Sequence, residues 1–384
     1  MISIAKVMQT LKTLTFLAAL LLCLPAAAAQ QPTAVPEGEP IAPEPVGNAP
    51  VQPIKPIKTP DVSGLWTVGR CVSGLWTVGR CVPLRIGMQA HLRYLVDDTE
   101  PYHQLVVKRA RLAVDLYPTP WLRAQVDVDV SELSVLKDAW VEVEPSAWLK
   151  LRAGQLKKPF SRVEATSSRQ LPLCERGIVN HHIIDDNNLE FGGRDLGIVA
   201  NGRFGDLRIS GGVFNGNGLF QENDSGKDFV VRPTYEFGKF LEVGASGTVK
   251  MRSDEADPAY SAGGFDARVR LGPMEAVLEG LWAQDGRDRS DVLGVIGYVQ
   301  LRYRVSDAVR LRPIVKAEFL NEGLGKEDNV AMAYMAGVNL HIAKVLRIML
   351  QVEQVVAQSQ CRTPNERRGM LQLAFDHRMD IHTD

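Results

Sequence analysis

Apolar and polar side chains alternate along most of the chain from residue 84 onward. The segment WLRAQVDVDV at 121–130 places Leu, Ala and Val at every second position, with Arg, Gln and Asp between them. The segments 105–117, 265–271 and 309–319 repeat this pattern. Because successive side chains of a β-strand point to opposite faces, the pattern predicts strands with one apolar face and one wet face.

About sixteen segments of this kind follow one another, so the predicted fold class is all-β. They lie near 84–94, 105–117, 121–131, 134–144, 148–156, 194–204, 206–214, 228–237, 240–251, 263–271, 274–284, 291–305, 308–320, 330–342, 345–356 and 367–376.

The connections between these segments alternate between tight turns and mostly longer, polar loops. Tight turns at one end and long loops at the other are the layout of an outer-membrane barrel. Seven aromatic residues gather at the tight-turn end, where Tyr and Trp favour the boundary between membrane and water. They are Tyr117, Trp121, Trp148, Phe204, Phe237, Phe240 and Tyr303.

A soluble β-sandwich is the competing architecture, because its strands alternate as well. Sandwich strands average about five or six residues, whereas these segments run longer and suit a tilted crossing of the hydrocarbon layer. A strand edge exposed to lipid leaves unpaired backbone groups that cost several kcal/mol each, so the sheet has to close. We therefore predict a transmembrane antiparallel β-barrel of about 16 strands with a water-filled lumen.

The stretch LKDAWVEVEPSAWLKLRAGQLKKPF at 136–160 shows what the two faces of the barrel carry. Ala139, Val141 and Val143 fall on the lipid side, together with Lys137, whose long stem can snorkel near the loop end. The lumen side receives Asp138, Trp140, Glu142, Glu144, Lys150 and Arg152. Charged side chains are therefore expected to line a passage.

The N-terminus has the three regions of a secretory signal peptide over residues 1–29. Lys6 and Lys12 precede an apolar run at 14–24, and small residues follow it. The run is too short for a spanning helix, so cleavage is expected near Ala29. These features predict export, and with the barrel they place the protein in the outer membrane of a Gram-negative cell.

Between the signal peptide and the barrel, residues 30–61 are rich in proline, which predicts an extended, unpacked periplasmic segment. The decapeptide VSGLWTVGRC then occurs twice within 62–81. Two perfect copies favour a tolerated local duplication, and the alternative is a disulfide between Cys71 and Cys81. The barrel itself is expected to cover residues 82–376.

The overall composition excludes several classes of function. A formal net charge of −1 and a pI near 6.7 show no basic bias, so no nucleic-acid partner is expected. The cysteines that remain after cleavage are too few and too scattered for a disulfide scaffold, and none has metal-site spacing. No spanning helix is expected after residue 29, which still permits a membrane protein built from strands.

The stretch from about 105 to 215 resembles the phosphate-selective porin O/P family of Gram-negative outer membranes. The matching words are VKRARLAVDL, LKDAWVEV, LKLRAGQLKKPFS, EATSSRQLPLCERGIVN, GRDLGIVANGRFG and GGVFNGNG. The resemblance implies a sixteen-stranded channel surrounded by outer-membrane lipid, and a homotrimer.

Three features depart from that family. Cys174 replaces a residue that is usually bulky and apolar, and the duplicated decapeptide is foreign to the family. The chain continues after Phe375, which is the expected equivalent of the terminal aromatic residue of barrel proteins. Residues 377–384 are therefore expected to form a C-terminal tail.

The longest loop, 157–193, follows the fifth strand, the position from which porins fold a loop into the lumen. Cations in this loop and on the neighbouring inward faces can concentrate anions and replace the lost hydration of a phosphate-like solute. The candidate lining residues are Lys157, Lys158, Arg162, Arg169, Arg176, Lys150, Arg152, Arg109 and Arg111. The alternative is a solvated wall of ion pairs, because the predicted inward faces hold about seventeen Arg and Lys against about thirteen Asp and Glu.

His181 and His182 raise the question of a metal site or a hydrolase. Adjacent histidines on an extended segment point to opposite sides, which suits neither shared coordination nor a proton relay. A pairing of Ser167 with His181 has no supporting motif. We therefore expect no enzyme activity, no catalytic residues, no metal and no cofactor.

The sequence thus predicts an outer-membrane porin for passive diffusion of small hydrophilic solutes, with a preference for small anionic solutes such as phosphate or polyphosphate. Two alternatives remain open. One is a general or weakly cation-selective porin, and the other is a structural or adhesive barrel with a closed lumen.

Overall fold

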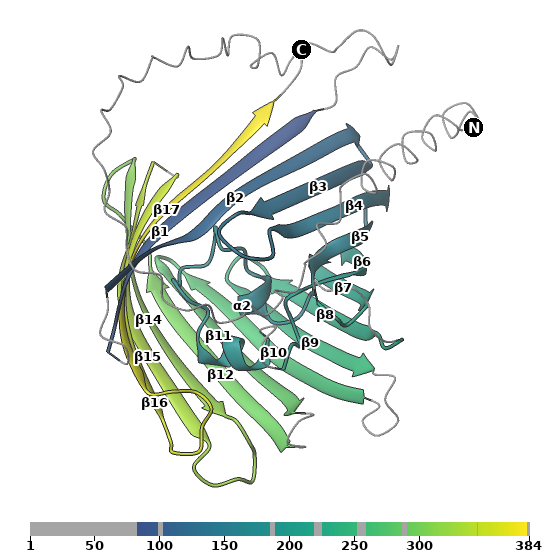
Figure 1. Ribbon diagram of the computed structural model, residues 1–384. Coiled ribbons are helices and arrows are strands. Elements are labelled where there is room, and N and C mark those ends of the chain that lie inside the picture. The colour runs from purple at the N-terminus through teal and green to yellow at the C-terminus, as the bar shows by residue number, and fades with distance from the viewer. Residues whose placement is uncertain are drawn as a thin grey trace, which may run out of the picture. The chain divides into compact units, whose positions relative to one another are not determined.

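The computed structural model describes residues 83–98, 103–184, 189–218, 225–251, 259–285, 290–343 and 345–381. In these ranges one antiparallel sheet closes on itself, because β1 (Leu84–Asp97) pairs with both β2 (His103–Thr119) and β17 (Glu366–Ile381). Figure 1 shows the resulting barrel from the side. The predicted signal peptide, Pro-rich segment, duplicated decapeptide and Cys71–Cys81 disulfide lie outside the described residues.

The remaining strands follow one another around the barrel in sequence order. They are β3 (Leu122–Asp129), β4 (Leu136–Ser146), β5 (Leu149–Lys157), β6 (Arg194–Phe204), β7 (Leu207–Phe214), β8 (Asp228–Phe237), β9 (Leu241–Met251), β10 (Ala259–Leu271), β11 (Met274–Asp285), β12 (Ser290–Leu301), β13 (Tyr303–Arg304), β14 (Val309–Asn321), β15 (Val330–Ile342) and β16 (Leu346–Ala357).

β12 and β13 are two parts of one interrupted strand, since both pair with β14. The barrel therefore has sixteen strands, which confirms the predicted fold. Two short helices, α2 (Arg162–Ala165) and α3 (Ile178–Ile183), interrupt the loop between β5 and β6. None of the helices in the described part of the chain is long and apolar enough to span a membrane.

The last strand runs further than the sequence pattern suggested. β17 ends at Ile381, so the expected boundary at residue 376 lies five residues too early. His377 falls on the outward face and interrupts the apolar pattern there. Pairing nevertheless continues, because β1 is long enough to provide partners as far as Leu84, opposite Ile381.

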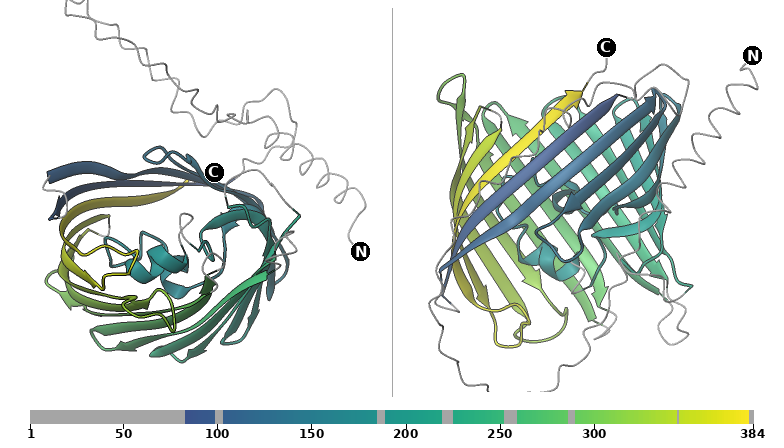
Figure 2. Two further views of the ribbon diagram at one scale, coloured as in Figure 1. Left: turned by 60° about the horizontal axis from the view of Figure 1, so that its bottom comes forward. Right: turned by 45° about the horizontal axis from the view of Figure 1, so that its top comes forward.

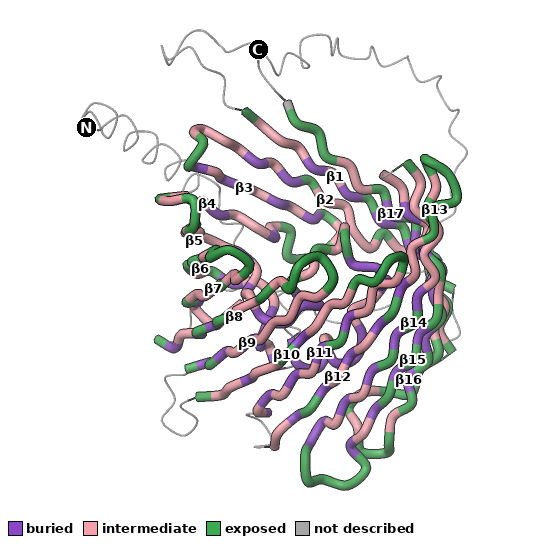
Figure 3. The backbone as a smooth tube through the Cα atoms, turned by 180° about the vertical axis from the view of Figure 1, so that it is seen from behind, coloured by how far each residue is buried: buried purple, intermediate pink, exposed green. Residues whose placement is uncertain are grey.

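The outward face of the barrel is apolar. Leu196 and Ile198 on β6 and Phe265 on β10 are more than half exposed, as are many other outward-facing side chains. Figure 3 shows exposed and more buried positions succeeding one another along the strands. This is the arrangement that a lipid environment requires of strands with a period of two.

At the tight-turn end, the predicted aromatic residues are exposed with one exception. Trp121, Trp148, Phe204, Phe237, Phe240 and Tyr303 are 40% to 54% exposed. Tyr117 instead faces the lumen, where the guanidinium carbons of Arg85 and Arg123 lie 5.8 and 5.5 Å from its ring centre.

Lys137 was expected on the lipid side, and that prediction is wrong. The register between β3 and β4 shifts where Asp127 pairs with Asp138 and Val128 pairs with Leu136. This bulge leaves Lys137 without a partner in the ladder and turns it inward, where it is buried and paired with Glu132. A charged side chain thereby avoids the lipid.

Candidate functional site

The loop between β5 and β6 folds into the barrel and packs against one side of its wall. Figure 2 shows its helical segments inside the ring of strands. Phe160, Ile183 and Phe191 of the loop are fully or almost fully buried, together with wall residues such as Leu281 and Leu320. Apolar contacts therefore fill the part of the lumen next to β7–β16.

Two carboxylates of the wall hold the starts of the two helices. Glu279 on β11 accepts hydrogen bonds from the backbone N–H groups of Arg162 (2.6 Å) and Val163 (3.0 Å). Glu318 on β14 accepts them from Ile178 (3.2 Å) and Val179 (3.4 Å). Negative charge at these unsatisfied N–H groups stabilises the helix starts.

The segment between the two helices is tied to the wall through its backbone carbonyls. Arg347 on β16 donates to the carbonyl oxygens of Ser168 (2.9 Å) and Leu171 (3.1 Å). Asn339 on β15 donates to the carbonyl oxygen of Pro172 at 2.7 Å. The loop is thus a fixed part of the barrel interior.

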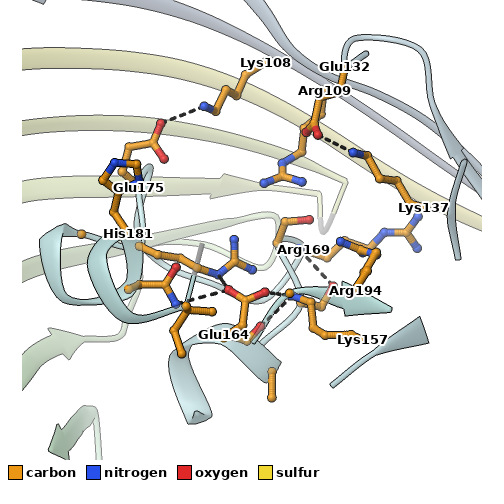
Figure 4. Close-up of a pocket in the computed structure, with 18 of the residues that line it drawn as sticks. Lys108, Arg109, Glu132, Lys137, Lys157, Glu164, Arg169, Glu175, His181 and Arg194 are labelled. Carbon is orange, nitrogen blue, oxygen red and sulfur yellow. Dashed lines mark hydrogen bonds and ion pairs between the residues drawn. The ribbon is translucent and has the colours of Figure 1, made fainter. Parts of the chain in front are cut away.

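An open cavity of about 960 Å³ remains on the other side of the loop. The loop forms one side of this cavity, and the inward faces of β1–β5 and β17 form the other. Part of the loop between β16 and β17, including Arg362 and Thr363, also lines it. Figure 4 shows charged side chains from both sides pointing into this space.

Among the described residues that line the cavity, positive side chains outnumber negative ones. Its lining includes twelve cations, which are Lys108, Arg109, Arg111, Lys137, Arg152, Lys157, Arg169, Arg176, Arg194, Arg362, Arg368 and Arg378. It includes six carboxylates, which are Asp127, Glu132, Asp138, Glu164, Glu175 and Glu366.

Most of these charges form ion pairs. Glu164 lies 2.6 Å from the Nζ of Lys157, as a dashed line in Figure 4 indicates, and 2.9 Å from the Nε of Arg176. Burial acts to raise the pKa of Glu164, but these two cations outweigh it and lower the pKa to about 2. Glu175, which pairs with Lys108 at 3.0 Å and with Arg93, has its pKa lowered to about 2 in the same way.

Four lining residues remain without a charged partner. Within the described ranges, the side chains of Arg109, Arg169 and Arg378 form no ion pair or hydrogen bond, and neither does the carboxylate of Asp127. The uncommitted charges are therefore three positive and one negative. Arg109 points towards the middle of the cavity in Figure 4.

The sequence of the barrel's first half matches a known family. The family model described as phosphate-selective porin O and P matches residues 106–275. Residues 106–275 are thus similar to this family. Together with the barrel fold, the match supports an outer-membrane channel protein of Gram-negative type.

Solved porin structures share the fold at low sequence identity. OmpF of Salmonella typhi, in complex with daunomycin, has a TM-score of 0.59 at 10% identity, over 77% of this chain and 97% of that one. The anion-selective porin from Comamonas acidovorans has 0.57 at 9%, over 77% and 99%. OmpT of Vibrio cholerae in its trimer form has 0.55 at 11%, also over 77% and 99%. No curated protein sequence matches the chain.

Six of the nine candidate residues of this porin line the cavity. They are Arg109, Arg111, Arg152, Lys157, Arg169 and Arg176. Of these, Arg111 pairs with Asp129 at 2.7 Å and Arg152 pairs with Glu142 at 2.5 Å.

The other three candidates lie elsewhere. Lys158 is only 2% exposed and lies 2.6 Å from Asp228 and 3.1 Å from Asp195. Arg162 is buried against the opposite wall, where it pairs with Asp266 and Glu242. Lys150 pairs with Glu144 at 2.9 Å, near the tight-turn end and outside the cavity lining. The geometry makes Lys158 and Arg162 anchors of the loop.

Several lining cations were not selected from the sequence. Arg194 begins β6 directly after the long loop. Lys108 and Lys137 are each left without a partner at a register shift, between β1 and β2 and between β3 and β4, and both line the cavity. Arg378 lies beyond the expected end of the barrel, so its inward position depended on the extra length of β17. Of these, only Arg194 offered a usable signal in the sequence, because it directly follows the predicted lumen loop 157–193.

The two histidines do not lie on an extended segment as expected, because residues 178–183 form α3. Both histidines line the cavity, but His182 is buried and its Nδ1 lies 3.8 Å from Glu322. Burial lowers the pKa of His182, which favours its neutral form. No group of three or more His, Cys, Asp or Glu side chains that would suit a metal ion occurs among the residues described.

Proposed function

We propose that this porin is a diffusion channel for small hydrophilic solutes that prefers anions to cations, with phosphate and polyphosphate among its solutes. We also propose that it is exported through a cleaved signal peptide and assembles as a homotrimer. The OmpT structure in its trimer form supports the last point through the shared fold.

The observation that carries the anion preference is the set of unpaired charges along the cavity. Arg109, Arg169 and Arg378 have no carboxylate partner among the described residues, and only Asp127 offsets them. Unpaired cations in a narrow, low-dielectric passage raise the local concentration of anions and exclude cations. Ion pairs elsewhere in the lining contribute little net field.

The side chains involved favour oxyanions over halides. An arginine guanidinium presents several N–H donors in a planar fork that matches two oxygens of a phosphate or carboxylate. The name of the matched family points to phosphate, and that of the anion-selective porin from Comamonas acidovorans points to anions in general. Inhibition of the chloride current by added phosphate measures this preference.

A planar-bilayer recording tests the proposal. In a KCl gradient, the reversal potential of the wild-type channel is expected to show anion preference. Arg109→Gln combined with Arg169→Gln should reduce the anion-to-cation permeability ratio by at least about twofold, because two unpaired charges are lost from the passage. The matched control is Arg304→Gln, which removes an exposed charge paired with Asp307 at the tight-turn end, outside the cavity lining.

Each outcome of the recording separates the alternatives. Anion preference that falls in the double variant and stays unchanged in Arg304→Gln supports the proposal. Cation preference or no preference in the wild type supports a general porin instead. Absence of any conductance from a protein that shows the heat-modifiable migration of a folded barrel supports a structural barrel.

A further inference from the structure

Five inward positions form one row across neighbouring strands of the passage wall. Asp138, Asp127, Ala113, Gly87 and Arg378 lie directly opposite one another on β4, β3, β2, β1 and β17. Adjacent strands are about 4.8 Å apart, so the number of strands between two positions in the row gives their approximate distance. Acids occupy one end of it, a base occupies the other end, and the two smallest residues lie between them.

Arg169 of the loop covers the glycine in this row. A Cβ atom on Gly87 would lie 2.8 Å from Nη2 and 3.1 Å from Nη1 of Arg169, so the guanidinium rests directly on the backbone of β1. Gly87 lies two strands away from Asp127, which places the two opposite charges roughly 10 Å apart. Ala113 forms the floor between them and faces the open cavity.

Both charges lack a partner where one is needed. Asp127 is 8% exposed, and its Oδ1 has no hydrogen-bond partner within the described residues. The Nη1 of Arg169 is likewise buried without a partner. An unpaired buried charge is costly, so the pair is set up for a ligand that supplies the missing partners.

The Asp127 carboxylate and the Arg169 guanidinium interact electrostatically but are not in contact. No ion pair joins Asp127 and Arg169 within 4.0 Å, although both line the same cavity. Burial, together with the nearby Arg378, lowers the pKa of Arg169, while Asp376 and Asp127 act in the opposite direction. The gap over Ala113 is bounded at one end by Asp127 and at the other by the guanidinium groups of Arg169 and Arg378, with the carboxylate of Asp376 also near Arg169.

We infer that this gap is a binding subsite for zwitterionic solutes of the α-amino acid class. The ammonium and carboxylate groups of an α-amino acid are about 3 Å apart, and a charge-assisted hydrogen bond at each end adds about 2.8 Å, so the bound solute spans roughly the distance between Asp127 and Arg169. A simple anion satisfies the arginines alone and is repelled by Asp127. The inference rests on the proposed passage but names a solute that phosphate preference does not imply.

Three probes of equal size test the subsite in planar bilayers. L-Alanine carries both charges, L-lactate carries only the carboxylate, and L-alaninamide carries only the ammonium. Each is titrated against the chloride current of the full-length channel, and the half-blocking concentration is measured. We expect L-alanine to block at a concentration up to about fivefold below those of the other two, because one additional charged contact in water is worth up to about 1 kcal/mol.

The variants assign the two contacts. Asp127→Asn should bring the half-blocking concentration of L-alanine up to that of L-lactate, and Arg169→Gln should bring it up to that of L-alaninamide. Asp138→Asn is the matched control, because it removes the same charge from the next strand at a carboxylate that is already paired with Arg194 at 3.1 Å. It should leave the ratio between L-alanine and L-lactate unchanged.

The result that overturns the subsite is a wild-type channel that conducts but is blocked no better by L-alanine than by L-lactate. An equal effect of Asp127→Asn and Asp138→Asn on the ratio also overturns it, since net charge alone would then explain the data. Absence of conductance would instead contradict the proposed channel function, so the two failures are distinguishable.

Discussion

Neighbouring lysines at the start of the lumen loop differ in role because they face different partners. Lys157 lines the cavity and pairs with Glu164 of the loop, whereas Lys158 turns towards β6 and β8 and lies between two buried aspartates. The sequence predicted both as cavity cations, since charge type and loop position are the same for the two. The carboxylates that give Lys158 its different role are 37 and 70 residues away from it, and no local sequence pattern predicts such contacts.

Lys158→Met tests the anchoring role. The substitution leaves Asp195 and Asp228 buried without their cation, and breaking such a pair costs about 3–5 kcal/mol. We therefore expect the heat-modifiable gel shift of the barrel to occur at a clearly lower temperature than in the wild type. Ion selectivity of the channels that remain folded should not change. A change in reversal potential would show that Lys158 contributes to the charge of the passage.

Among the elements, strands and loop differ in how far the sequence determines them. Lipid on the outside and water on the inside force a period of two on every strand, so the sixteen strands were predicted from the pattern alone. The helices α2 and α3 have four and six residues, which is too short for stability on their own. They form because Glu279 and Glu318, on strands more than 100 residues away, accept hydrogen bonds from the backbone N–H groups at their starts.

Gly177→Ala tests the hold of Glu318 on the loop. Gly177 has a φ of 101°, and a Cβ atom there would lie 2.1 Å from Oε2 of Glu318. We expect the start of α3 to be displaced, which should lower the temperature of the gel shift and make the single-channel current noisier. Gly205→Ala is the control, because Gly205 has a φ of 63° but nothing within 4 Å of its Cβ position, so it pays only the left-handed strain of about 1 kcal/mol. Equal effects of the two variants would contradict the role of Glu318 in holding the start of α3.

For the whole molecule, the loop divides the lumen into a packed part and an open part. Inward-facing apolar residues such as Leu281, Ile296 and Ile314 belong to the packed part, and they were not expected on a wet face. The charge of the passage therefore differs from that of the lumen as a whole. The sequence predicted a modest excess of Arg and Lys over Asp and Glu on the inward faces, whereas the described lining of the cavity has twice as many cations as carboxylates. Only the packing of the loop determines which charges belong to the passage.

That origin of the anion preference predicts how it depends on salt. The unpaired arginines act on ions in water across the passage, so their field is screened over a Debye length of about 10 Å at 0.1 M salt and about 3 Å at 1 M. The anion-to-cation permeability ratio should therefore fall towards the free-solution ratio as mean KCl rises from 0.1 to 1 M at a fixed gradient. A size filter or a tight halide site would keep the ratio constant over this range, and a constant ratio would show that the charged lining does not set selectivity. The variant lacking Arg109 and Arg169 should begin with a lower ratio and depend less on salt, because fewer unpaired charges remain to be screened.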